Sequence, residues 1–214
     1  MSSPTNQIAA FEAALLANAS DYNIELSADD LRLLTAYYEV INTWNPRLHL
    51  VAPCSAKEFA KRHILESLLL LRYLPDSASV VDIGSGAGLP IVPCLIVRDD
   101  ISALLIEAAK RKAVFLREAL NVIGRASSAK VMAERFETVR TPTAQFITSR
   151  ALNRFLTILP KLVDWAPPQS TMLLFGGLDL ERTLDTLCLT HSRIQIPNSE
   201  KRFLFVVEVV KTAN

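Results

Sequence analysis

Val80-Val81-Asp82-Ile83-Gly84-Ser85-Gly86-Ala87-Gly88 is the stretch that decides the fold of this chain. Its apolar residues predict a buried strand of a parallel sheet, and its glycines predict a tight turn into a helix. Glycine suits such a turn because the backbone adopts positive φ there and approaches a ligand closely. The stretch therefore predicts a strand–turn–helix unit that binds a small ligand at the carboxyl end of the strand.

The spacing of the glycines narrows the class of ligand. A dinucleotide-binding loop reads G-x-G-x-x-G and would need glycine at position 89, where this chain has Leu89. Here the third glycine is Gly88, and the carboxylate of Asp82 stands two residues before the first. A carboxylate at that place suits a ligand with an amino group and no phosphate. The pattern disfavours a nicotinamide-dependent oxidoreductase and resembles the first motif of class I S-adenosylmethionine-dependent methyltransferases.

Composition is that of an ordinary globular protein, with 50% hydrophobic and 21% charged residues among 214. The net charge of +1 does not indicate a nucleic-acid binder, so any RNA-binding basic residues must gather on one face. Cys54, Cys94 and Cys188 are scattered, which argues against disulfides and a zinc site and favours a reducing compartment. With no signal-peptide pattern and no apolar stretch of about 18–20 residues, we expect a soluble, cytoplasmic protein without a metal.

Two regions differ in their pattern, and we predict a boundary between an N-terminal helical extension (1–75) and a core domain (76–214). Apolar residues at helical spacing from Ile8 predict a first helix. Ser27 is a plausible N-cap for a second helix, which Asn45-Pro46 is expected to end. A third helix is predicted over about 55–73.

The core domain alternates short apolar strands with helices, which predicts an α/β fold with a mostly parallel sheet covered on both faces. The expected strands are 79–83, 103–107, 129–133, 145–149, 171–175, 193–196 and 202–210. The expected helices are about 89–98, 110–123, 152–165 and 178–189. The last two strands have no helix between them, so they predict a C-terminal antiparallel hairpin. Together these elements predict a Rossmann-like, seven-stranded class I methyltransferase fold.

Ligands of such sheets bind beyond the carboxyl ends of the strands, where three side chains stand out. Glu107, about 20 residues past the glycine loop, can accept hydrogen bonds from ribose hydroxyls, or merely cap the following helix. Phe136 can pack against an adenine, or be plain core. Arg150 follows the fourth strand and can clamp phosphate or face guanine O6, or form a surface ion pair.

Several segments, in order along about residues 37–176, resemble one family in particular. They are Trp44-Asn45 with Leu48 and Leu50, Arg62-His63-Ile64-Leu65-Glu66-Ser67, the glycine loop through Leu89-Pro90 with Pro93, Lys110-Arg111, Phe115-Leu116-Arg117-Glu118, Arg135 with Glu137, and Ser149-Arg150-Ala151. The chain is similar to bacterial small-subunit ribosomal RNA (guanine-N7) methyltransferases of the glucose-inhibited-division B type.

The resemblance implies methyl transfer from S-adenosylmethionine to N7 of a guanine in 16S ribosomal RNA, with rRNA or the small subunit as partner and a monomeric enzyme. Its cofactor residues would be Asp82, Gly84, Ser85, Gly86, Gly88, Leu89, Glu107, Arg135, Phe136 and Arg150. Its substrate residues would be Arg62, His63, Arg150 and Arg154, with Arg150 also catalytic. His63 has the alternative of a satisfied packing histidine.

Other activities lack their usual sequence marks. Exocyclic-amine methylation usually shows an N/D-P-P-Y/F/W segment after the fourth strand, and cytosine C5 methylation needs a cysteine nucleophile there. Cys94 lies instead on the helix after the glycine loop, where it is expected to be a buried small hydrophobe. The family usually has asparagine at His49, often glycine at Ile91, and lysine at Phe175. These departures keep two alternatives open: a methyltransferase for a small molecule or protein, and a cofactor-binding homologue without turnover.

Overall fold

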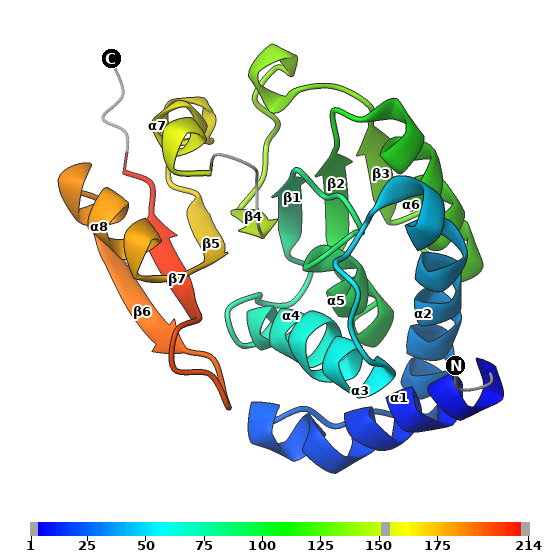
Figure 1. The fold of residues 1–214 in the computed structure, drawn as a ribbon. Coiled ribbons are helices and arrows are strands. Elements are labelled where there is room, and N and C mark those ends of the chain that lie inside the picture. Colours follow the sequence, from blue (N-terminus) through cyan, green and yellow to red (C-terminus); the bar gives the residue numbers. More distant parts are fainter. Residues whose placement is uncertain (1–3, 151–154, 211–214) are drawn as a thin grey trace.

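A single sheet organises the chain (Figure 1), whose computed structural model describes residues 4–150 and 155–210. Within these residues, seven strands pair in the order β3-β2-β1-β4-β5-β7-β6. Their bounds are β1 Ser79–Ile83, β2 Ser102–Ile106, β3 Ala129–Met132, β4 Phe146–Arg150, β5 Thr171–Gly176, β6 His191–Gln195 and β7 Phe203–Glu208. Strands β1 to β5 pair in parallel, whereas β7 is antiparallel to both β5 and β6. The predicted Rossmann-like sheet with a C-terminal antiparallel hairpin is confirmed.

Helices precede the sheet and alternate with its strands. Their bounds are α1 Pro4–Asn18, α2 Ala28–Leu48, α3 Ala56–Phe59, α4 Glu66–Leu68, α5 Ile91–Val97, α6 Lys110–Val122, α7 Phe155–Trp165 and α8 Leu178–Thr186. A π-helical turn (Ala60–Leu65) joins α3 to α4, and a 3₁₀ turn (Leu69–Arg72) extends α4. These pieces form one continuous helical segment, as predicted over 55–73.

Successive side chains of each strand point to opposite faces of the sheet, and both faces are buried. Val80 belongs to a hydrophobic cluster that also holds buried residues of α1, α2, α5 and α6. Its neighbour Val81 belongs to a second cluster, which α7 and α8 complete. Figure 1 shows α2 and α6 on one side of the sheet and α7 and α8 on the other. The continuous apolar strands of the sequence therefore follow from burial on two faces.

The N-terminal helices pack through a group of aromatic rings. Phe11 of α1 stacks on Tyr38 of α2 with ring centroids 4.4 Å apart, and Phe59 of α3 lies 4.9 Å from Tyr38. All three rings belong to the same cluster as the strand residue Val80. The N-terminal helices thus share one core with the sheet, and the domain boundary at residue 75 stays a prediction.

Helix α2 begins where the sequence predicts and ends later. The Ser27 hydroxyl accepts from the backbone N–H of Asp30 and the Asp30 carboxylate accepts from the N–H of Ser27, which makes a capping box. The predicted stop at Asn45-Pro46 is wrong, because the helix continues through Pro46 to Leu48. Two local features offset the proline: the side chain of Asn45 bonds both backbone groups of Val51, at 3.0 and 3.1 Å, and Leu48 becomes buried.

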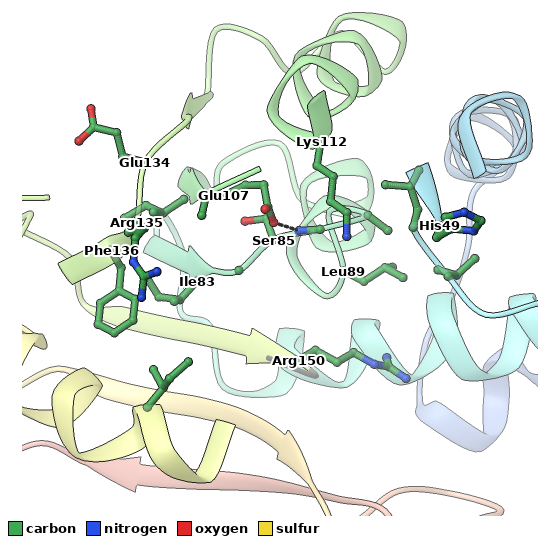
Figure 2. Close-up of a pocket in the computed structure, with 18 of the residues that line it drawn as sticks. His49, Ile83, Ser85, Leu89, Glu107, Lys112, Glu134, Arg135, Phe136 and Arg150 are labelled. Carbon is green, nitrogen blue, oxygen red and sulfur yellow. Dashed lines mark hydrogen bonds between the residues drawn. The ribbon is translucent and has the colours of Figure 1, made fainter. Parts of the chain in front are cut away.

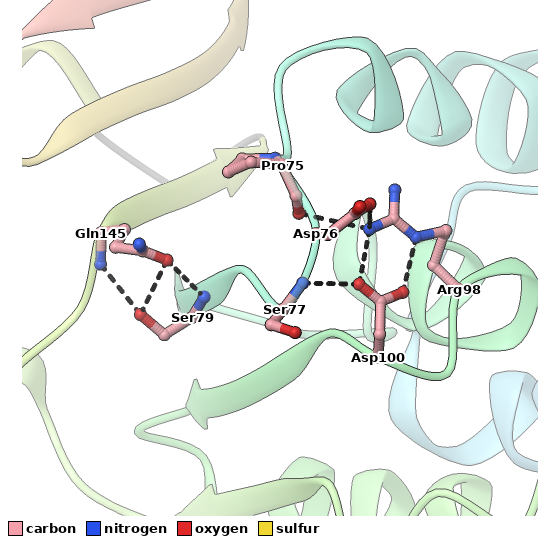
Figure 3. A network of polar contacts seen from close by, with 7 residues as sticks. All are labelled: Pro75, Asp76, Ser77, Ser79, Arg98, Asp100 and Gln145. Atoms are coloured by element: carbon pink, nitrogen blue, oxygen red, sulfur yellow. Dashed lines mark hydrogen bonds and ion pairs between the residues drawn. The ribbon is translucent and has the colours of Figure 1, made fainter.

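A polar network secures the amino end of β1 (Figure 3). The Arg98 guanidinium pairs with Asp100, and the Asp100 carboxylate accepts from the backbone N–H of Ser77 at 2.6 Å. This hydrogen bonding with Arg98 holds the pKa of Asp100 well below its usual range. Gln145, just before β4, accepts from the backbone of Ser79 at 3.0 Å. The network fixes the end of β1 that lies opposite the glycine loop.

Candidate functional site

A cavity of about 660 Å³ opens at the carboxyl end of β1 and β2, within the size range of small-molecule sites. Segments far apart in the sequence form its wall: the ends of β1, β2 and β4, the start of α6, and the chain after α2 (Figure 2). Predicted site residues line it together with two others, His49 and Lys112; the predicted ones are His63, Gly84, Ser85, Gly86, Leu89, Glu107, Arg135, Phe136 and Arg150. The cavity lies where ligands bind in open α/β sheets.

The glycine loop forms the floor of the cavity. Gly84, Gly86 and Gly88 have φ values of 68°, 54° and 85°, which is the left-handed region that disfavours other residues. The buried Tyr37 hydroxyl of α2 donates to the Ala87 carbonyl and so ties the loop to the N-terminal helices. Gly88 itself does not line the cavity; a Cβ there would lie 2.6 Å from Val92 Cγ2. The third glycine is therefore required by packing behind the loop.

Glu107 serves the loop and the following helix at once. One carboxylate oxygen accepts from the backbone N–H of Gly86 at 2.8 Å, and the other accepts from the N–H of Ala109 at 2.8 Å. Ala109 is the N-cap residue of α6, which has no side-chain cap, so Glu107 supports the chain just before the helix. Because an ionised carboxylate has about four acceptor sites, capacity remains for a ligand's hydroxyls. Glu107 lines the cavity, and its role toward a ribose stays a prediction.

Asp82 lies behind the loop and is 0% exposed. The Thr148 hydroxyl donates to one of its carboxylate oxygens at 2.7 Å, while the other has no partner among the described residues. Burial raises the pKa of Asp82 to about 7. Asp82 does not line the cavity, so its side chain meets the loop rather than open space. A buried carboxyl with an unused oxygen costs stability, which indicates a functional reason for it.

Asp82 is expected to make stability depend on pH. Its unfolded pKa is near 3.8 and its folded pKa is near 7, so between these values the native state holds a proton that the unfolded state has lost. Stability therefore falls as pH rises through this window, on the order of 4 kcal/mol in total. Asp82→Asn should flatten the fall in urea unfolding between pH 4 and 8. An equal fall in both proteins would contradict the assignment.

The segment after β3 forms one side of the cavity. Phe136 is 6% exposed and meets Trp165 edge to face, with ring centroids 5.7 Å apart. It therefore packs in the core and also borders the cavity. The exposed Arg135 side chain pairs with Glu137 at 3.0 Å. Figure 2 shows Arg135 and Phe136 side by side, across the site from His49.

Arg150 forms an ion pair that is buried rather than at the surface. Its Nη2 donates to Glu66 at 2.8 Å and also to the Arg62 carbonyl, and its guanidinium carbon lies 5.2 Å from the centroid of the Phe175 ring. The guanidinium thus covers Phe175, which is itself 8% exposed. Nη1 of Arg150 is buried and has no partner among the described residues. Arg150 thus lines the cavity with a guanidinium that its partners hold in place.

The other predicted substrate residues differ in position. Arg62 does not line the cavity and pairs with Glu58 at 2.7 Å. His63 lines the cavity and packs on Phe59 with ring centroids 4.9 Å apart, but its Nδ1 has no partner among the described residues. His63 is therefore a packing histidine whose hydrogen bonding is incomplete. Burial, with Arg150 second, lowers its pKa to about 3 and keeps it neutral. Arg154 lies outside the described residues.

Two lining residues were not assigned to the site from the sequence. His49 follows the last residue of α2 with φ 48° and lines the cavity. The signal was its place in the family's segment, where the usual asparagine tolerates left-handed backbone. Lys112 also lines the cavity, and Figure 2 shows its side chain directed into the site. The prediction that Cys94 is a buried small hydrophobic residue is confirmed, since it is 0% exposed.

The part of the chain that the structure describes contains no group of three or more His, Cys, Asp or Glu side chains that could hold a metal ion. None of its helices has both the length and the apolar character to cross a membrane.

Comparison with known proteins places the chain in a family. The family model described as rRNA small subunit methyltransferase G matches residues 30–208. A relative of that name from Gluconobacter oxydans is 36% identical over 137 residues, which are 63% of this chain and 66% of the relative. Another from Rhodospirillum centenum is 37% identical over 154 residues, 71% of this chain and 69% of the relative.

A solved structure agrees at the level of the fold. The crystal structure of an S-adenosylmethionine-dependent methyltransferase from Aquifex aeolicus superposes with a TM-score of 0.59 at 14% identity, over 81% of this chain and 98% of that one. At this identity the likeness concerns the fold alone. The match of the family model over residues 30–208, together with the two relatives, shows that the chain belongs to the rRNA small subunit methyltransferase G family.

Proposed function

We propose that this protein transfers a methyl group from S-adenosylmethionine to N7 of a guanine in small-subunit (16S) ribosomal RNA. One observation carries the proposal: separate segments of the family resemblance meet at one cavity. His49 follows the Trp44-Asn45 segment, His63 belongs to the R-H segment, and Arg150 to the S-R segment, and all three line the cavity with the glycine loop. Residues that we expect to serve the cofactor and residues that we expect to serve the acceptor thus line one cavity.

The cavity residues fit S-adenosylmethionine. The Gly84–Gly88 turn presents backbone close to the cavity, and Glu107 has acceptor capacity beyond its two backbone bonds. Arg150 lines the cavity, and Glu66 holds its guanidinium, so the side chain can meet polar groups of a ligand. These are the groups that would hold the nucleoside and amino-acid parts of this cofactor.

The chemistry asks little of the protein beyond alignment. Bound S-adenosylmethionine would supply an electrophilic methyl group on a positively charged sulfur. Guanine N7 has an in-plane lone pair and no proton, so the chain needs no general base. Its residues contribute by holding the two reactants in line and by accommodating the positive charge that develops on the base. A neutral His63 adds no opposing positive charge.

Three basic residues stand together at one edge of the site. Lys112 lines the cavity, next to Lys110 and Arg111 at the start of α6. Cations there can meet RNA phosphates, so binding should weaken steeply as salt rises. We propose a monomer that acts in the cytoplasm, where its substrate rRNA or small subunit is found.

A labelling assay tests the proposal. The purified protein is incubated with S-adenosylmethionine carrying a tritiated methyl group and with small subunits, naked small-subunit RNA, large subunits or a protein extract. We expect label in the small-subunit RNA, recovered as 7-methylguanosine after nuclease digestion. Label only in protein or small molecules would overturn the acceptor. Tight cofactor binding without label in any acceptor would favour a homologue without turnover.

A further inference from the structure

Glu66 is a buried carboxylate held between two guanidinium groups. It lies on α4 and is 1% exposed. Arg150 donates to one of its oxygens at 2.8 Å, and Arg202, just before β7, donates to the other at 2.7 Å. Burial raises the pKa of Glu66, and the two arginines oppose that shift. A buried carboxylate is costly to desolvate and its ion pairs add little net stability, so stability alone does not explain why Glu66 is there.

Arg150 connects this cluster to the cavity. Arg150 lines the cavity, whereas Glu66 and Arg202 are not among its lining residues. Its guanidinium is held by Glu66 and the Arg62 carbonyl through Nη2 and by the face of Phe175. These contacts leave Nη1 as the donor without a described partner. The orientation of the guanidinium at the cavity wall is therefore set by the contacts of Nη2 and of Phe175.

We propose that Glu66 is a positioning residue, which fixes the Arg150 side chain at the cavity wall, where it contacts the cofactor. The inference rests on the proposed function for the identity of that cofactor. A flexible arginine side chain loses much rotamer freedom when it binds a ligand, and a preformed ion pair supplies that order beforehand. Glu66 acts only through Arg150, since it does not reach the cavity itself.

A double-mutant cycle separates positioning from general support of the fold. The affinity for S-adenosylhomocysteine is measured by calorimetry for the wild type, Glu66→Gln, Arg150→Met and the double variant. We expect Glu66→Gln to weaken binding about tenfold in the wild type and less than about twofold when Arg150 is already methionine. An equal loss in both backgrounds, or no loss in the wild type, would overturn the proposal.

Arg202 offers the matched control, because it bonds the same carboxylate from outside the cavity. Arg202→Gln should change the affinity by less than about twofold. Glu66→Gln alone leaves the guanidinium groups of Arg150 and Arg202 without a counter-charge. It is therefore also compared in the Arg202→Gln background, where the double variant has lost one positive and one negative charge. There the tenfold loss should persist. A loss from Arg202→Gln as large as that from Glu66→Gln would show a merely structural network.

Binding of S-adenosylhomocysteine does not depend on the methyl acceptor. Absence of methyl transfer to small-subunit RNA would therefore overturn the proposed function and leave this test intact. Conversely, transfer to RNA that proceeds with unchanged cofactor affinity in Glu66→Gln would overturn the positioning role alone.

Discussion

Replacing Gly88 with alanine is expected to destabilise the fold by about 3 kcal/mol and to abolish cofactor binding at ordinary concentrations. Gly88 has φ 85°, where a side chain adds about 1–2 kcal/mol of strain. The new Cβ would also lie 2.6 Å from Val92 Cγ2 and 3.1 Å from the Tyr37 hydroxyl, and such overpacking costs about 1–3 kcal/mol. Relief would move the loop and break the bond from Tyr37 to Ala87.

Two other glycines provide matched controls for backbone strain. Gly86 has φ 54°, and a Cβ there meets nothing closer than the Gly84 carbonyl at 3.6 Å. Gly86→Ala should therefore cost only about 1 kcal/mol of stability yet weaken cofactor binding about tenfold or more, because its methyl stands in the cavity. Gly124→Ala carries similar strain outside the cavity lining and should leave binding unchanged.

Urea unfolding and calorimetry with S-adenosylhomocysteine measure these effects separately. The expected order of stability loss places Gly88→Ala first, with Gly86→Ala and Gly124→Ala similar to each other. If Gly88→Ala were as stable as wild type, or if Gly86→Ala bound the cofactor normally, the loop would not have the role assigned to it.

Replacing Arg150 with methionine is expected to lower the rate of methyl transfer about 10²- to 10³-fold while the protein stays folded. Loss of one preorganised donor in an enclosed site typically has an effect of this size. The fold should tolerate the change because Glu66 keeps its bond to Arg202 at 2.7 Å, so no buried charge is left alone. The methionine stem can also cover Phe175 in place of the guanidinium.

Arg150→Lys is the control that keeps the charge. A lysine cannot donate in the planar fork of a guanidinium, so it should recover only part of the lost rate. Initial rates with small subunits, together with thermal unfolding of each variant, measure the two effects. Full activity in Arg150→Met would show that Arg150 has no role in methyl transfer.

Most of the fold could be predicted from the sequence because its patterns are local. Strand 79–83 was predicted with its observed bounds, since an apolar run followed by closely spaced glycines has few other structures. The antiparallel tail followed from the lack of a helix between its strands. The continuation of α2 through Pro46 was not predicted, since the sequence pattern shows neither the burial of Leu48 nor the bonds from the Asn45 side chain to Val51.

The sequence predicted which residues line the site better than it predicted the contacts between them. Glu107 and Arg150 were found because they end strands, and strand ends meet at one edge. The pairing of Arg150 with Glu66 joins residues 84 positions apart and exists only in the tertiary structure. The sealed position of Asp82, likewise, depends on Thr148 of a neighbouring strand. Charge partners and burial therefore had to come from the structure.

The most direct test of the central claim is mapping 7-methylguanosine in small-subunit rRNA from cells that lack this protein. We predict that one 7-methylguanosine present in wild-type rRNA is missing, that the wild-type protein restores it, and that Arg150→Met does not. An unchanged set of 7-methylguanosines in cells without the protein would contradict the account.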